Sequence, residues 1–185
     1  MDLKERISKF RQPKFANRKR NKESYVNIAK YAYANLDRLC KEYNSTVNNE
    51  DTVKLIRTDV DQVLRRFHKY CIKERIGSHY IEIGVDLDDA EFEHMVPNTV
   101  TLDLLLHNVI TVTDACNMPT CTLSKERHNS LREKGWGSKT PDIYEFWKRY
   151  EYCFEVDGQF TTWDGIPVDV NQTLLKHLQT ESSWI

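Results

Sequence analysis

The sequence predicts an α+β protein in which an N-terminal basic arm and a helical hairpin precede a domain of short strands and helices. Residues 1–23 are basic and show no sustained apolar period. Residues 24–76 repeat apolar side chains at helical spacing, and after Gly77 short alternating runs are typical of strands. We therefore expect an arm over 1–23, a hairpin over 24–76 and a third domain over 77–185.

Charge is unevenly distributed along the chain. The net charge is only −1, yet nine basic residues and one acid lie between Lys4 and Lys22, so the remainder is acidic overall. Such asymmetry predicts an arm that meets a polyanion, although a solubilising tail has the same composition. Phe10 and Phe15, interleaved with the cations, favour nucleic acid. The arm residues expected to contact DNA are Arg11, Lys14, Arg18, Lys19, Arg20 and Lys22.

Segments that would direct the chain out of the cytosol are not evident. No stretch is apolar enough for a transmembrane helix, and the basic N-terminus lacks the apolar run of a signal peptide. The five cysteines are odd in number and scattered, which favours a reducing compartment over a disulfide scaffold. We expect a cytoplasmic protein, in a bacterium or a phage-infected host, with no membrane partner.

Two helices are predicted before Gly77. Apolar residues recur from Ile28 to Tyr43, with Ser24 placed to cap the first helix. Residues 44–49 form a turn, and a second apolar face runs from Val53 to Cys71. The short connection predicts an antiparallel hairpin.

Shorter elements are predicted after Gly77. Pro97 ends one strand, Ser124 offers an N-cap, and Gly135 stops the helix that Ser124 opens. Pro141 is placed to open a further helix, and Asp157-Gly158 to turn a hairpin. The expected order is a strand over 79–83, an acidic loop over 86–89, a strand over 91–96, a helix over 99–107, a strand over 120–123, helices over 125–134 and 141–150, a hairpin over 154–163 and a helix over 170–180.

One constellation carries candidate chemistry. A strand ends in Glu93-His94-Met95-Val96-Pro97, and after a loop a second strand leads through Ser124 into a helix with His128 near its start. This order over residues 93–131 resembles the HNH nucleases, and most closely the phage-encoded free-standing homing endonucleases. The resemblance implies a ββα-metal nuclease core, a two-stranded ribbon and a helix around one divalent metal, followed here by C-terminal helices.

The resemblance also assigns roles to residues. Glu93 and His128 would hold Mg²⁺ or Mn²⁺, His94 would be the general base, and Asn117 would orient the His94 ring. Asn108 and Asn129 are rivals for the role of Asn117. The implied function is cleavage of double-stranded DNA, by a homodimer or by sequential nicking if both strands are cut. Cations expected to contact phosphates beside the metal are Lys125, Arg127 and Arg132.

Three other interpretations stay open. Cys116 and Cys121, with His107 and His128 nearby, have the residue types of a structural zinc site. A catalytically inactive DNA-binding protein would bind DNA without regard to divalent metal. A phage accessory protein that binds another protein through its hairpin would show little salt-dependent affinity for DNA.

Deleting residues 1–22 is expected to weaken the affinity for duplex DNA at moderate salt, because nine basic residues are removed. Metal-dependent cleavage at high enzyme concentration should persist, since the motif lies outside the arm. Fluorescence anisotropy at several salt concentrations measures the affinity. Equal affinities of the full-length and shortened proteins would remove the arm from the DNA-contact surface.

Overall fold

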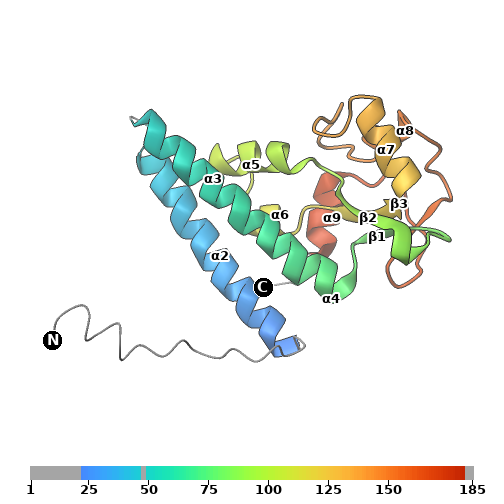
Figure 1. The fold of residues 1–185 in the computed structure, drawn as a ribbon, viewed down its shortest axis with the longest axis horizontal. Helices are drawn as coiled ribbons and strands as arrows, with labels where there is room; N and C mark the ends of the chain where they lie inside the picture. Colours follow the sequence, from blue (N-terminus) through green and yellow to red (C-terminus); the bar gives the residue numbers. More distant parts are fainter. Residues whose placement is uncertain (1–21, 47–48, 182–185) are drawn as a thin grey trace, which may run out of the picture.

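The computed structural model describes residues 22–46 and 49–181, which form a long helical hairpin beside a mixed unit built on a four-stranded sheet (Figure 1). The mixed α+β class is therefore confirmed. The arm residues Arg11, Lys14, Arg18, Lys19 and Arg20 lie outside the described residues. No helix in the described part is long and apolar enough to cross a membrane.

The hairpin pairs α2 (Lys22–Ser45) with α3 (Glu50–Phe67). Its seam is apolar, with Leu36, Val60 and Leu64 completely buried, as the helical period predicts. Asn49 caps α3 by accepting a hydrogen bond from the backbone N–H of Thr52 at 3.1 Å. Ser24 lies inside α2, so the prediction that it caps this helix is wrong.

Helix α3 continues into a π-helical segment, η1 (His68–Lys73), and then into the short α4 (Glu74–Ile76). The wider π turn was not predicted, because its apolar spacing resembles that of an α-helix; such turns often occur at functional sites. The chain leaves α4 at Gly77 with φ of 81°. A Cβ at Gly77 would lie 2.2 Å from the Trp163 ring, so both the backbone and this indole require glycine.

The sheet has the order β2-β3-β1-β4. Its strands are β1 (Tyr80–Glu82), β2 (Ala90–His94), β3 (Thr120–Ser124) and β4 (Phe160–Thr162). Strands β2 and β3 pair antiparallel, with Glu93 opposite Cys121 and His94 opposite Thr120. Strand β1 runs parallel to β3 and antiparallel to β4. Strand β2 is thus an edge strand, and the predicted strands near 79–83, 91–96 and 120–123 are confirmed.

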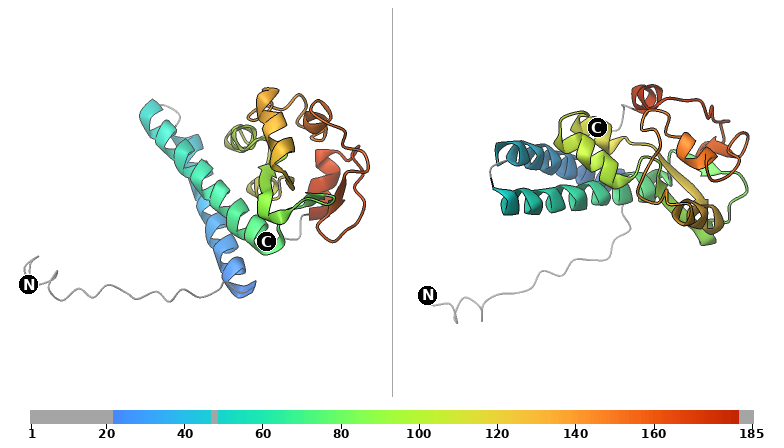
Figure 2. Two further views of the ribbon diagram at one scale, coloured as in Figure 1. Left: turned by 45° about the vertical axis from the view of Figure 1, so that its right-hand side comes forward. Right: turned by 90° about the horizontal axis from the view of Figure 1, so that it is seen from above.

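Helices occupy the connections between the strands and the segment after β3. The segment between β1 and β2 contains the 3₁₀ turn η2 (Leu87–Asp89), and the loop between β2 and β3 contains α5 (Asn98–Leu106) and α6 (Val112–Cys116), which pack on the hairpin. Three helices follow β3: α7 (Lys125–Glu133), α8 (Lys148–Glu151) and α9 (Leu174–Glu181). Figure 2 shows the hairpin on one side and the sheet with these helices on the other. Two apolar clusters result, one around the hairpin and one between the sheet and the C-terminal helices.

Two C-terminal predictions were wrong. The helix predicted over 141–150 is reduced to α8, because the Asp142 carboxylate accepts from the backbone N–H groups of Tyr144 and Glu145 and stabilises a turn. The hairpin predicted over 154–163 does not form, since β4 pairs with the distant β1. By contrast, Ser124 caps α7 as predicted, accepting from the Arg127 N–H at 3.5 Å.

Buried histidines occupy the junction between the sheet and the helices. His177 of α9 lies 2.7 Å from the Tyr80 hydroxyl and donates to the Asn117 carbonyl over 2.9 Å. The ring of His79 lies 4.9 Å from that of His177, and its Nδ1 accepts from the Thr120 backbone N–H. Burial lowers the pKa of His177 to about 4 and the pKa of His68 in η1 to about 4.

Acidification is expected to destabilise the fold before most carboxylates titrate. A histidine with a lowered pKa binds its proton mainly in the unfolded state, so its stabilising effect is lost as pH falls from about 6.5 toward about 4. The loss is about 2 kcal/mol at about pH 5 and reaches about 3 kcal/mol near pH 4 for each of His68 and His177, because one pKa unit is worth about 1.36 kcal/mol. Urea unfolding at about pH 7 and about pH 5 measures it. A constant free energy of unfolding would contradict this account.

Candidate active site

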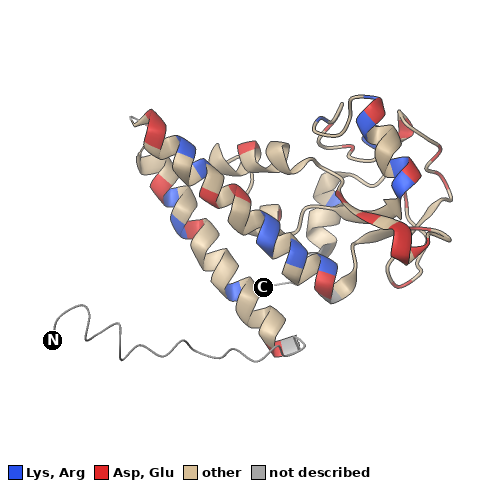
Figure 3. Ribbon diagram, in the orientation of Figure 1, with Lys and Arg blue, Asp and Glu red and all other residues tan. Residues whose placement is uncertain are grey.

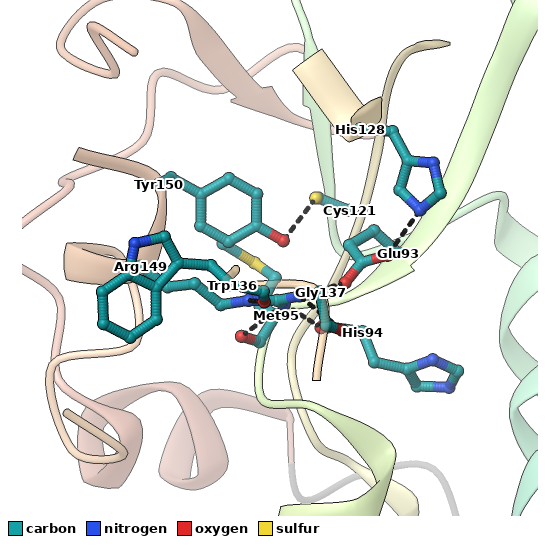
Figure 4. A network of polar contacts seen from close by, with 9 residues as sticks. All are labelled: Glu93, His94, Met95, Cys121, His128, Trp136, Gly137, Arg149 and Tyr150. Atoms are coloured by element: carbon teal, nitrogen blue, oxygen red, sulfur yellow. Dashed lines mark hydrogen bonds and ion pairs between the residues drawn. The ribbon is translucent and has the colours of Figure 1, made fainter. Parts of the chain in front are cut away.

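Glu93 and His128 meet at the edge of the sheet. The Glu93 Oε2 atom lies 3.2 Å from the His128 Nε2 atom (Figure 4). Glu93 reaches this point because it lies opposite Cys121 on the face of β2 that α7 covers. His128 lies in the first turns of α7, which starts where β3 ends. The strand–loop–strand–helix order thus brings both predicted metal ligands together.

A buried arginine holds the other oxygen of Glu93. Arg149 of α8 is completely buried, and its Nη2 atom lies 2.7 Å from Glu93 Oε1. The same guanidinium donates to the backbone carbonyls of His94 at 2.8 Å and Trp136 at 2.7 Å, and to those of Met95 and Gly137. Its donors are therefore well satisfied, as a buried cation requires. Sequence reasoning missed Arg149; its one signal was a cation inside the aromatic run from Phe146 to Tyr150.

The ion pair affects the protonation of His128. The hydrogen bond to Glu93 raises the pKa of His128, and partial burial opposes that rise. Because a metal ion binds the unprotonated imidazole, a cation at this position must displace the proton through which His128 hydrogen-bonds to Glu93.

The pair fits a divalent cation in distance and in donor type. Two ligands at right angles on one ion, each with a bond of about 2.1 Å, lie roughly 3 Å apart, close to the observed separation. No cluster of three or more His, Cys, Asp or Glu residues that could bind a metal occurs among the described residues. A cation here would take two protein ligands, and water and phosphate oxygens would complete its shell, as is usual for Mg²⁺. The positive charge of Arg149 beside Glu93 weakens the pull of this carboxylate on a cation.

His94 lies on the opposite face of β2 from Glu93. Neighbouring residues of a strand point to opposite faces, and β2 is regular through His94. No local twist turns both side chains toward one point, as the predicted role of His94 as general base would require. In Figure 4 the imidazole points away from the Glu93 carboxylate, and its Nε2 atom lies 3.0 Å from Nδ1 of His68.

The contacts of His68 fix the tautomers of both rings. The Ala115 carbonyl, 3.1 Å from Nε2 of His68, can only accept, so this nitrogen donates. Burial lowers the pKa of both histidines, which keeps the rings neutral at pH 7. The unprotonated Nδ1 of His68 then accepts from Nε2 of His94. Nδ1 of His94 is consequently left with its lone pair, and it bonds to no described residue.

Asn117 does not orient the His94 ring as predicted, because His68 holds that ring instead. Asn117 is buried at the end of α6, and its carbonyl accepts from His177. Its side-chain oxygen is buried without a hydrogen-bond partner among the described residues. Of the rivals, Asn108 pairs with Asn44 far from β2, and Asn129 is an exposed residue of α7.

The predicted phosphate contacts on α7 differ in their surroundings. Lys125 is exposed and pairs with Asp89. Arg127 is mostly buried: it pairs with Glu82 at 3.1 Å and stacks 4.8 Å from the Phe154 ring centre. Arg127 connects α7 to β1 through this ion pair, so its guanidinium is not free to bind a phosphate. Arg132 is exposed and forms no ion pair with the described part of the chain.

The cysteines are separated in the core. Cys116 belongs to the apolar cluster of the hairpin, whereas Cys121 lies 3.3 Å from the Tyr150 hydroxyl in the other cluster. Burial raises the pKa of both thiols, which opposes the thiolate form that zinc binds.

Comparisons with known proteins add no assignment. A scan against family models, a search of curated proteins and a search of solved structures each return no match to the chain. Functional inference therefore depends on the geometry around Glu93.

Glu93→Gln is expected to lower the free energy of unfolding by about 3 kcal/mol, because the buried guanidinium of Arg149 loses its counter-charge. His128→Gln should cost less than about 1 kcal/mol, since its pair with Glu93 is partly exposed to solvent. Urea unfolding of both variants at about pH 7 measures the difference. Equal destabilisation of the two variants would show that Arg149 does not depend on Glu93.

Proposed function

We propose that the chain is a divalent-metal-dependent endonuclease of the HNH class that hydrolyses phosphodiester bonds in duplex DNA. The observation that supports this best is the approach of Glu93 and His128 to 3.2 Å within the β2–β3–α7 unit. That unit has the two strands and helix implied by the sequence resemblance. Site-specific cutting of the homing type, and a homodimer that cuts both strands, are extensions of this proposal.

His94 is assigned the role of general base in this proposal, and its ring, which lies on the face of β2 opposite to Glu93, would have to turn toward the cation when DNA binds. Its ring is neutral at pH 7, and its Nδ1 lone pair is the one that the bond to His68 leaves available. His68 is a positioning residue, held in turn by the Ala115 carbonyl. A base oriented by a second group that is itself fixed is the arrangement expected of a proton acceptor.

Glu93 and His128 hold the cation, and Arg149 keeps the Glu93 carboxylate in place. A bound Mg²⁺ or Mn²⁺ supplies charge stabilisation for the phosphate and the leaving oxygen. Because Arg149 occupies Oε1, only Oε2 of Glu93 faces the cation position beside His128. Phosphate oxygens then complete the shell, so cation and DNA are expected to bind cooperatively.

His94→Ala should abolish nicking of supercoiled plasmid in the presence of Mg²⁺, because general-base catalysis typically contributes about 10²–10⁴-fold. DNA affinity should be almost unchanged, whereas the free energy of unfolding should fall by about 1–3 kcal/mol, because the buried Nδ1 of His68 loses its donor. His128→Ala should instead lower the affinity for the cation, so that more Mg²⁺ is needed for nicking, and excess Mn²⁺ should partly rescue its activity. The readout is conversion to open circles over time, together with anisotropy for binding.

His107→Ala is the matched control, because His107 is an exposed histidine at the end of α5. It should cut as the wild type does. A well-folded His94→Ala protein that cuts at the wild-type rate removes His94 as the base. Wild-type protein that binds DNA without cutting, whatever the metal, would favour a non-enzymatic DNA-binding protein, in which the Glu93–Arg149 pair is purely structural.

A further inference from the structure

Basic side chains gather on one half of the hairpin. The four exposed cations Arg65, Arg66, Lys69 and Lys73 lie along the part of α3 and η1 nearest the sheet; we call them the basic strip. Residues 65, 69 and 73 recur every four positions, so they share one face of the helix, with residue 66 beside them. Figure 3 shows this basic strip, whereas the far half of α3 carries both acidic and basic residues.

Most of the basic strip has no neutralising partner within the described part of the chain. Arg65 pairs with Asp61 at 2.8 Å, but Arg66, Lys69 and Lys73 form no ion pair with any residue of 22–46 or 49–181. Toward the other end of the hairpin, Arg38, Lys41 and Lys54 each lie 2.7 Å from a carboxylate one turn away, whereas Lys30 of α2 forms no ion pair with the described residues. Unpaired cations on a single face leave a positive potential that attracts a polyanion.

The basic strip lies beside the strand that carries the candidate site. The Lys73 Nζ atom is 5.7 Å from the ring centre of Phe92, the residue before Glu93 on β2. His68, in the same π-helical segment, bonds to His94 at the end of β2. Strand β2 is the sheet edge, so the basic strip and the pair Glu93–His128 flank one edge strand.

We infer that the basic strip is a contact surface for the phosphate backbone of duplex DNA; the choice of partner rests on the proposed function. Residues 65 to 73 span roughly 12 Å of helix at 1.5 Å per residue. That length covers about three phosphates of one strand at 3.4 Å per phosphate along the duplex axis. The π-helical segment contributes both to the candidate site and to the basic strip. It directs His68 inward to His94, while Lys69 and Lys73 remain exposed.

The test is the salt dependence of DNA binding by the full-length triple variant Arg66→Gln/Lys69→Gln/Lys73→Gln. Binding to a short fluorescent duplex is measured in EDTA, so that cleavage does not interfere. The slope of log K against log salt concentration should become shallower by about 2 to 3, at about 0.9 for each phosphate that the variant no longer neutralises. Affinity at low salt should fall more than tenfold.

The matched control is Arg38→Gln/Lys41→Gln/Lys54→Gln, which removes the same charge from the hairpin farther from the sheet. It should bind nearly as the wild type does, and thermal unfolding checks the folding of both variants. Equal effects of the two triples, an unchanged slope, or wild-type protein that binds polyglutamate as tightly as duplex DNA would overturn the inference.

Plasmid cleavage at saturating enzyme separates this inference from the proposed function. A shallower slope in the strip variant, with no cleavage by any version of the protein, supports the contact surface and removes the nuclease. If the wild type cleaves DNA and the salt slope of the strip variant is unchanged, the basic strip is not a DNA-contact surface, and the nuclease proposal still holds.

Discussion

The ion pair between Arg149 and Glu93 organises the part of the fold that contains the candidate site. A guanidinium with no exposed surface is stable only when its donors are satisfied. Here a carboxylate from β2 and backbone carbonyls at the end of β2 and in the turn after α7 meet that need. One side chain therefore joins the edge strand, the turn after α7 and helix α8. The same contact fixes which oxygen of Glu93 faces His128.

The hairpin is joined to this part by polar contacts as well as by apolar packing. His68 of the π-helical segment bonds to His94 of β2 on one side and to the carbonyl of Ala115 in α6 on the other. Asp61 of α3 accepts from the side chain of Asn98 at the start of α5 at 2.6 Å. Because buried polar groups tolerate few alternative positions, these bonds set the distance between the hairpin and the sheet. The hairpin is thereby held against β2 and α5.

The residues that take part in the proposed reaction lie on opposite faces of β2. On one face, Glu93 and His128 offer a carboxylate oxygen and an imidazole nitrogen, and on the other His94 has its ring set by His68. Strand β2 is an edge strand, so one of its two sides pairs with no neighbouring strand among the described residues. A substrate bound along this edge would meet the ligand pair from one direction and the histidine pair from the other. The electrostatics are consistent with this division, since Glu93 is paired with cations and His94 is kept neutral by burial.

Most of the local structure could be predicted from the sequence, because period and capping act over a few residues. The predictions included both hairpin helices, the strands that carry Glu93 and Thr120, the Ser124 cap and the approach of Glu93 to His128. Contacts between distant segments arose only in the folded chain: the pairing of β4 with β1, the ion pair of Arg127 with Glu82 and the bond from His68 to His94. Arg149 shows the reason most clearly. A basic residue in α8 resembles a surface cation until the fold brings a carboxylate and several carbonyls around it, and these come from segments remote in the chain.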